Sequence, residues 1–357
     1  MEASIKGRAI ILVMIFFLLL VTGIFTQVNA QLARNIKVDN SHPLSQVKTA
    51  GKEIDHHNDV NLTAEATALN SGINGPFTEL KPALTPNGNR LYFSRHLHPD
   101  NTHGEDLEDI WFSDYDPKTK TWSDPALLTG HLNNAGPNFI NNVSVTGDTV
   151  ILGNQYHKKG KMRAGLSYSV NVGGDWSVPK NIHIKNDYNI SNQANAFVSL
   201  KSGVIIQAIE RVETYGDRDL YVSFWNGHTA TEPINMGSAL NTELEESSPY
   251  LDADNKTLYF ASKGHNGYGG YDIWVSERLD DSWTNWSEPR NLGPAVNSAL
   301  DDEFFSITHC GNYAIFSKQV SVHNIDLFRI SVDELFNEPL PKDFKRPTEG
   351  NSSLAAL

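Results

Sequence analysis

The stretch Asn255-Lys-Thr-Leu258-Tyr259-Phe260 joins a turn to a short apolar strand core, and it decides the fold because it recurs. Four similar stretches, in which Gly leads into a three-residue strand core, stand elsewhere in the chain. They are Gly88-Asn-Arg-Leu91-Tyr92-Phe93, Gly147-Asp-Thr-Val150-Ile151-Leu152, Gly203-Val-Ile-Ile206-Gln207-Ala208 and Gly311-Asn-Tyr-Ala314-Ile315-Phe316. The central positions of all five cores, residues 92, 151, 207, 259 and 315, lie 59, 56, 52 and 56 residues apart. A period of this length indicates a repeat architecture.

A second marker has the same register. The asparagines at 74, 133, 189, 241 and 297 are also spaced by 59, 56, 52 and 56 residues. Two independent markers therefore agree in all five copies.

The fourth copy shows the content of one repeat most clearly. Its predicted strands are Pro249-Tyr-Leu-Asp252, Leu258-Tyr-Phe-Ala261, Tyr271-Asp-Ile-Trp-Val-Ser276 and Trp286-Ser-Glu-Pro-Arg-Asn-Leu292. Aromatic and β-branched residues favour strands, and no long apolar stretch after the N-terminal segment has a helical period. Four short strands per repeat predict an all-β chain that forms a β-propeller, with five four-stranded blades or, alternatively, six.

The same repeat resembles a known family. Ser248-Pro-Tyr, Leu258-Tyr-Phe, Gly267-Tyr-Gly-Gly-Tyr-Asp-Ile-Trp274, Trp286-Ser-Glu-Pro and Asn291-Leu-Gly are similar to the TolB-type WD40-like β-propeller repeat of Bacteroidetes envelope proteins. The resemblance covers about residues 70–340 and is tightest in copies one, four and five. Its relatives often carry an OmpA-like peptidoglycan-binding domain, and we expect none after about residue 345.

Two segments compete to close the ring. Residues 61–74 resemble the end of an outer strand that runs into a blade junction, so they are suited to complete the fifth copy from the N-terminus. Phe336-Asn-Glu-Pro339 would give that copy its own outer strand instead. We expect N-terminal closure.

The N-terminus predicts export. Lys6 and Arg8 precede an apolar run from Ala9 to Val21, and Val28-Asn-Ala30 resembles a cleavage site. We therefore expect a signal peptide over 1–30, a linker over 31–58, the propeller over 59–345 and a tail over 346–357, with no stable membrane span after cleavage. An uncleaved membrane anchor is the alternative, although the apolar run is short for one.

The composition limits the classes of partner and of covalent cross-link. The 357 residues carry a net charge of −13, so nucleic acid is an unfavourable partner. The single cysteine, Cys310, allows no disulfide within the chain.

Carboxylates at two repeated positions are the first chemical candidates. Asp109, Asp219, Asp272 and Asp326 precede the third strand of their copies, and we expect them, like the repeated asparagines, to hold turns. Glu79, Glu246 and Asp302 stand five residues after the repeated asparagine, where they would ring the channel mouth. Three roles are open to them: hydrogen bonding between blades, binding of a ligand or divalent cation, and acid–base catalysis of glycan cleavage.

The first copy has an enlarged polar loop. Its residues His96, His98, His103 and Asp106 are candidate ligands of zinc or another divalent cation. A solvated loop without a metal is the simpler interpretation.

Two tyrosines are candidates for ligand binding. Tyr268 and Tyr271 of the fourth copy are suited to stack on sugar rings, although packing within the protein is the alternative.

Together these features predict an exported binding or scaffold protein of the bacterial cell envelope. It would be periplasmic, outer-membrane associated or secreted, and it would engage a protein or a glycan. The alternative function is a glycan-active hydrolase or lyase that uses Glu79, Glu246 and Asp302.

Overall fold

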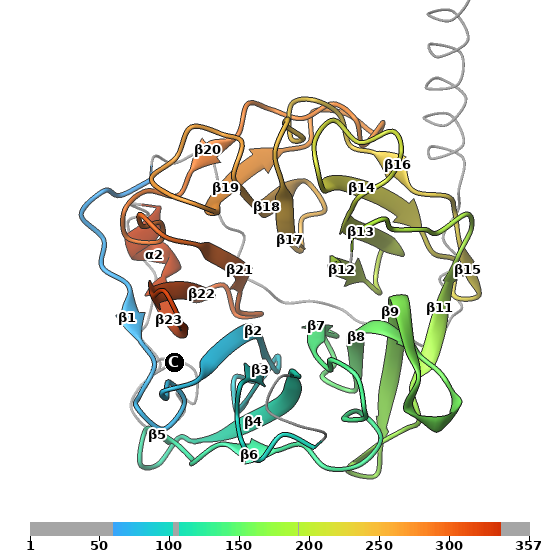
Figure 1. Ribbon diagram of the computed structural model, residues 1–357. Coiled ribbons are helices and arrows are strands. Elements are labelled where there is room, and N and C mark those ends of the chain that lie inside the picture. Colours follow the sequence, from blue (N-terminus) through green and yellow to red (C-terminus); the bar gives the residue numbers. More distant parts are fainter. Residues whose placement is uncertain (1–59, 103–106, 192, 337–357) are drawn as a thin grey trace, which may run out of the picture.

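Five β-sheets surround a central axis and form a five-bladed β-propeller (Figure 1). The computed structural model describes residues 60–102, 107–191 and 193–336. The innermost strand of each blade comes first in the repeat, and the following strands pair outward in antiparallel order. The prediction of an all-β propeller with five blades is confirmed.

The blades follow the order of the repeats, and their strands are these. The first blade has β2 (Thr78–Leu84), β3 (Arg90–His96), β4 (Asp109–Asp116), β5 (Thr121–Trp122) and β6 (Ala126–Leu127). The second has β7 (Ile140–Val143), β8 (Thr149–Tyr156), η1 (Lys158–Gly160), β9 (Met162–Val172), β10 (Asp175–Trp176) and β11 (Lys180–Ile184). The third has β12 (Asn195–Ser199), β13 (Val204–Ile209), β14 (Asp219–Phe224) and β16 (Ile234–Asn235), while its β15 (Thr229–Ala230) pairs in parallel with β11. The fourth has β17 (Glu246–Leu251), β18 (Thr257–Ser262), β19 (Asp272–Glu277) and β20 (Arg290–Asn291). The fifth has β21 (Asp302–Ile307), β22 (Tyr313–Ser321), β23 (Asn324–Ser331), the short helix α2 (Val332–Leu335) and β1 (Thr67–Ala68).

The second strand of each repeat lies in the middle of its blade. Every residue of β13 and β18 is buried, because neighbouring blades cover both faces of the sheet. This position explains why the recurring sequence core is a continuous apolar run rather than an alternating one.

The hydrophobic core is divided into layers between blades. Separate apolar clusters join blades one and two, two and three, three and four, four and five, and five and one. Each blade is therefore stabilised by its neighbours, and the ring behaves as one domain.

The turns that define the repeat share one backbone conformation. Gly88, Gly147, Gly203, Asn255 and Gly311 all have a positive φ, between 58° and 74°. Gly and Asn adopt this left-handed conformation at low cost, which explains their use at the tight turn between the first and second strands.

The N-terminal segment closes the ring. β1 is the outermost strand of the fifth blade and pairs antiparallel with β23, and the Leu69 N–H donates to the Leu327 oxygen at 2.9 Å. The expected N-terminal closure is confirmed. Phe336 does not form an outer strand, because it follows α2 and is fully buried against the fourth and fifth blades.

Some predicted segments lie outside the described residues. These are the signal peptide over 1–30, the linker over 31–58, Pro339 and the tail over 346–357. Within the described part of the chain, no helix is long and apolar enough to cross a membrane.

Candidate functional site

Four of the five repeated asparagines join neighbouring blades, and Asn189 is the exception. Asn297 accepts a hydrogen bond from the Ile273 N–H at 2.7 Å and donates to the oxygen of the same residue at 3.0 Å. Asn74, Asn133 and Asn241 bind both backbone groups of one third-strand residue in the same way. These asparagines do more than hold a turn, because each extends the third strand of the preceding blade with a side chain.

The three candidate acids are buried near these asparagines. Glu79, Glu246 and Asp302 are each 0% exposed. Glu246 accepts hydrogen bonds from the Thr242 N–H, the Thr242 hydroxyl and the Ser262 hydroxyl at 2.7–3.0 Å. Asp302 accepts from the N–H and hydroxyl of Ser298 at 2.6 and 2.9 Å.

Glu79 has a charged partner as well. It accepts from the Gly75 N–H, and Arg95 Nε lies 3.1 Å from its Oε1. In all three cases the carboxylate closes the loop that enters its blade. This geometry supports hydrogen bonding as the role of these acids.

Burial also changes how the acids titrate. It raises the pKa of Glu79, Glu246 and Asp302 to about 7 in each case, against the stabilising hydrogen bonds. Each acid also feels an aspartate of the preceding blade, as Asp302 feels Asp272 and Glu246 feels Asp219. A raised pKa suits a general acid, but these carboxyls lack the open, water-filled pocket in which a substrate would meet them.

Three of the four aspartates at the repeated position cap turns, as predicted, whereas Asp326 accepts from the side-chain amide of Asn324 at 3.0 Å. Asp272 accepts from the N–H groups of Tyr268 and Gly269, and Asp219 accepts from that of Tyr215 at 2.8 Å. Asp109 binds the Thr102 N–H in the same manner.

The histidine-rich loop has no assembled metal site in its described part. The ring of His98 packs between Phe77 and Trp111, with centroids 4.4 and 4.3 Å away, and its Nδ1 accepts from the Asp100 N–H. Burial lowers the pKa of His98. His103 and Asp106 lie outside the described residues. Elsewhere in the described chain, no three His, Cys, Asp or Glu side chains form a group suited to a metal ion.

The two candidate tyrosines differ in exposure. Tyr268 is 50% exposed on the loop between β18 and β19, whereas Tyr271 is buried. The Tyr271 hydroxyl accepts from Arg218 Nη2 at 2.6 Å and donates to Glu245 at 2.7 Å. Tyr268 therefore has a surface to offer a ligand, while Tyr271 is engaged in a polar network.

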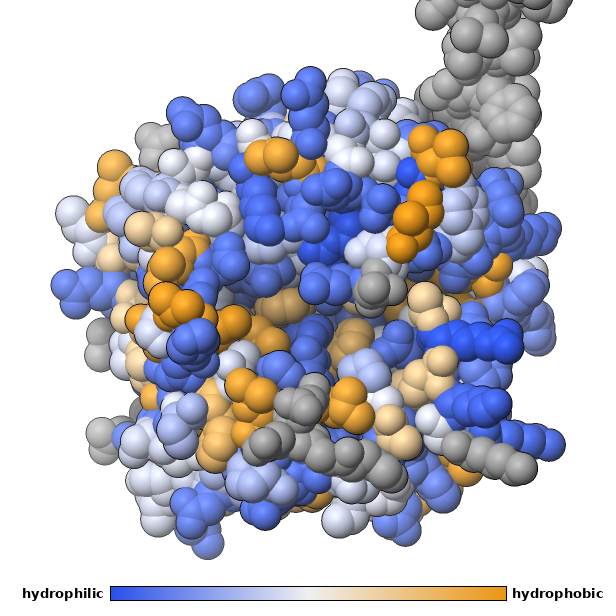
Figure 2. Space-filling model, viewed as in Figure 1, coloured by the Kyte–Doolittle hydropathy of each residue, from blue (hydrophilic) through white to orange (hydrophobic). Residues whose placement is uncertain are grey.

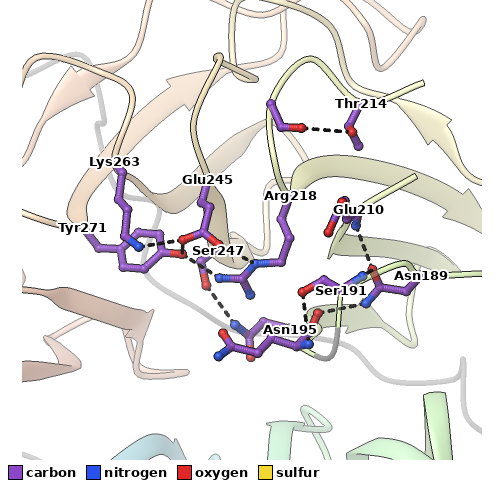
Figure 3. Close-up of polar contacts among 12 residues, drawn as sticks. Asn189, Ser191, Asn195, Glu210, Thr214, Arg218, Glu245, Ser247, Lys263 and Tyr271 are labelled. Atoms are coloured by element: carbon purple, nitrogen blue, oxygen red, sulfur yellow. Dashed lines mark hydrogen bonds and ion pairs between the residues drawn. The ribbon is translucent and has the colours of Figure 1, made fainter. Parts of the chain in front are cut away.

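That network lies between the third and fourth blades (Figure 3). Lys263 Nζ lies 2.6 Å from Glu245 and 4.3 Å above the ring of Tyr271. Burial opposes ionisation of Glu245, but the hydrogen bonds from Lys263 and Tyr271 lower its pKa. The Arg218 side chain is almost fully buried, and its Nε lies 3.7 Å from Glu245.

A second polar chain runs from blade three to blade five. Asn195 donates to the Ser247 hydroxyl at 2.8 Å, and Ser247 and Ser248 bind the Glu303 carboxylate at 2.7 and 3.0 Å. Burial raises the pKa of Glu303.

Sequence reasoning missed Arg218 and Glu245, although a signal was present. The residue before the repeated aspartate, or before Gly165 in the second copy, is Glu108, Ala164, Arg218, Tyr271 or Ile325. A position that varies in this way breaks the repeat symmetry, and a residue that breaks the symmetry is a better candidate for function than one that every copy repeats.

A central cavity of about 200 Å³ lies among the inner strands of all five blades. It extends from Lys81, Ser248 and Phe304 to the turns that follow the inner strands. These three residues have positive φ at matching bulges, which interrupt the pairing of β2, β17 and β21. The cavity is smaller than the roughly 300–1,000 Å³ that is usual for ligand pockets. None of the three candidate acids borders it.

The fold and the site together define a five-bladed propeller whose blade-junction face carries polar loops above sealed acids. No family model matches this chain, and no curated protein matches it.

Solved structures with similarity include TolB from Acinetobacter baumannii, with a TM-score of 0.43 and 15% identity over 73% of this chain and 53% of that one. The chain thus spans about half the length of that TolB structure. Two α-L-arabinofuranosidases are also similar. The enzyme from Podospora anserina has a TM-score of 0.46 and 12% identity, covering 76% of this chain and 98% of that one. The enzyme from Lactobacillus brevis has a TM-score of 0.45 and 13% identity, covering 78% and 100%. At these identities the likeness concerns the fold alone.

Proposed function

We propose that this chain is an exported, non-catalytic binding or scaffold protein of the bacterial cell envelope. It engages a protein or a glycan through the face that carries the blade junctions and the loops between second and third strands. The compartment rests on the predicted signal peptide and on the resemblance of the repeats to TolB-type envelope propellers.

The single observation that carries the proposal is the burial of the three acids. Glu79, Glu246 and Asp302 are fully buried, and each accepts a hydrogen bond from the loop that enters its blade. Most glycoside hydrolases use two carboxyl groups that flank the scissile bond. Loops on the same face instead present exposed side chains, which suits binding.

A turnover assay tests binding against catalysis. The purified protein is incubated with a panel of cell-wall and plant polysaccharides, and new reducing or unsaturated ends are measured. We expect no turnover by the wild type. Turnover that Glu246→Gln abolishes while circular dichroism stays unchanged would establish the hydrolase or lyase alternative.

Export has its own test. The full chain is expressed in a bacterial host, and the mature protein is recovered and its N-terminus sequenced. We expect a start at Gln31. Recovery of the uncleaved chain in the membrane fraction would instead support the anchor.

A further inference from the structure

Five large apolar or aromatic side chains are exposed on loops of the third and fourth blades. They are Tyr188 (36% exposed), Ile190 (56%), Val212 (84%), Tyr215 (56%) and Leu244 (49%), and we name them the junction-face patch. Figure 2 shows hydrophobic residues among hydrophilic ones at the upper right, where Figure 1 places β13, β14 and β16. Grouped apolar exposure of this kind marks interaction surfaces, whereas single exposed residues are ordinary.

The three loops of the patch touch one another. The Ile190 N–H donates to the Glu210 oxygen at 2.9 Å, and the Tyr188 hydroxyl bonds Glu213 at 3.0 Å. A Cβ built on Gly216 would lie 2.5 Å from the Leu244 oxygen, so the loop of Tyr215 packs directly on that of Leu244. The patch is therefore one surface and not five scattered residues.

The patch is also held in place from below. The Arg211 guanidinium stacks on the Tyr188 ring at 4.1 Å, and Thr214 bonds the Arg211 oxygen at 2.8 Å. The Tyr215 N–H is fixed by Asp219. A surface that is already ordered loses little conformational entropy when a partner binds.

Exposed carboxylates border the patch, and the exposed Lys263 near Leu244 is paired with Glu245 at 2.6 Å. Glu213, Asp217 and Glu243 are exposed, whereas the nearby cations Arg211 and Arg218 are buried. Arg211 pairs with Glu213, but within the described chain no cation forms an ion pair with Asp217 or Glu243. An acidic rim attracts a basic partner and repels an acidic one.

We propose that the junction-face patch docks a protein segment whose apolar side chains are flanked by lysine or arginine. The aliphatic groups of Ile190, Val212 and Leu244 offer a glycan no hydrogen bonds, but they suit Leu, Ile, Phe or Met side chains. The inference rests on the proposed binding function of this face and names the partner class.

A random peptide library displayed on phage is the probe. It is selected on the full-length protein and counter-selected on the double variant Val212→Ser with Tyr215→Ser. We expect the selected peptides to be rich in apolar residues and Lys or Arg. Synthetic copies should bind the double variant at least about tenfold more weakly by fluorescence anisotropy. The second double variant, Asp217→Asn with Glu243→Gln, should also bind the peptides more weakly than the wild type. This loss of affinity should be larger at low salt than at high salt.

A matched control uses exposed apolar residues elsewhere. Val172→Ser with Val178→Ser changes side chains that are 70% and 63% exposed beside β10, at the opposite end of the strands. These substitutions should leave the peptide affinity unchanged. Thermal unfolding of every variant checks that the propeller is intact.

Three outcomes would overturn the inference. One is selection of acidic or polar peptides, or of none. Another is peptide binding that the patch substitutions do not change. The third is a self-associated protein that Val212→Ser makes monomeric, since a second copy would then be the occupant. If one of these outcomes is accompanied by a glycan that binds the wild type and the double variant equally, the patch proposal fails while the proposed binding function stands.

Discussion

The side-chain amide of a junction asparagine makes the two hydrogen bonds that the backbone of a neighbouring strand residue would make. An Asn side chain has one carbonyl and one NH₂ group, so it can both accept from and donate to a single peptide unit. Asn297 does this with Ile273, and it also binds Asn291 at 2.9 Å. No shorter or charged side chain offers the same pair of groups.

Asn297→Ala should lower the free energy of unfolding by about 1–3 kcal/mol, because the buried Ile273 groups lose their partners. Asn189→Ala is the matched control. Asn189 binds the Glu210 N–H and the Gln193 oxygen at a partly exposed site, where water can replace it. Urea unfolding compares the two, and an equal or larger loss at Asn189 would contradict the account.

Glu246 tests the structural role of the acids at the same scale. Glu246→Ala leaves Thr242 and Ser262 without their buried acceptor, so a loss of about 1–3 kcal/mol is expected. Glu246→Gln keeps one acceptor oxygen and should cost less. The exposed neighbour Glu243→Gln should have almost no effect on urea unfolding. A stable Glu246→Ala protein would mean that the loop does not depend on this carboxylate.

At the scale of elements, two short segments complete the fifth blade. β1 supplies its outer strand from the opposite end of the chain, and the Asn61 N–H donates to the oxygen of Leu335, the last residue of α2, at 2.7 Å. Asn74 then binds Leu327, so the closing strand and the first junction meet at one residue of β23. Closure thus joins residues that are about as far apart in sequence as the propeller allows.

Leu69→Pro should open this closure. Proline removes the N–H that donates to Leu327, while Leu69→Ala removes the side chain but keeps the N–H. We expect Leu69→Pro to be less stable than Leu69→Ala by about 1 kcal/mol or more. Limited proteolysis should also cleave the Pro variant faster near residue 69. Equal stability of the two variants would show that the backbone contact is unimportant.

At the scale of the whole molecule, stability comes from five apolar layers and buried acids between blades. The described chain has one free thiol, Cys310, so no disulfide locks the ring. Every layer depends on both blades that border it, and loss of one contact weakens the ring as a whole.

The buried acids predict how stability varies with pH. The pKa values of Glu79, Glu246 and Asp302 are raised from 4.5, 4.5 and 3.8 to about 7, so the folded state binds more protons than the unfolded state between these limits. Their contribution to the free energy of unfolding is therefore full below pH 4 and falls as the pH rises to about 7. Urea unfolding at pH 5, 6, 7 and 8 measures the slope.

Glu246→Gln is the control for this prediction, because it removes one titrating group and should flatten the fall between pH 5 and 7. Stability that rises across this range would show that the acids are ionised in the folded protein.

Much of the fold was predictable from the sequence, but the site was much less so. The five turns and five asparagines gave the number of blades, since turn chemistry is local and repeats with the chain. The sequence also brought Glu79, Glu246 and Asp302 to one face. It did not reveal their burial, because that depends on the loops of neighbouring blades. Arg218 and Glu245 escaped notice because their meeting with Tyr271 joins separate repeats.

By itself the sequence determined the β-propeller repeat and the acidic character of the chain, and it favoured five blades and N-terminal closure over their alternatives. Local turns, strand periodicity and composition act within a repeat, so they can be inferred without coordinates. Only the tertiary structure decided which carboxylates are sealed and which side chains remain exposed on the junction face. Burial is a property of how blades pack, and residues such as Val212 and Leu244 become one surface only when the ring is closed.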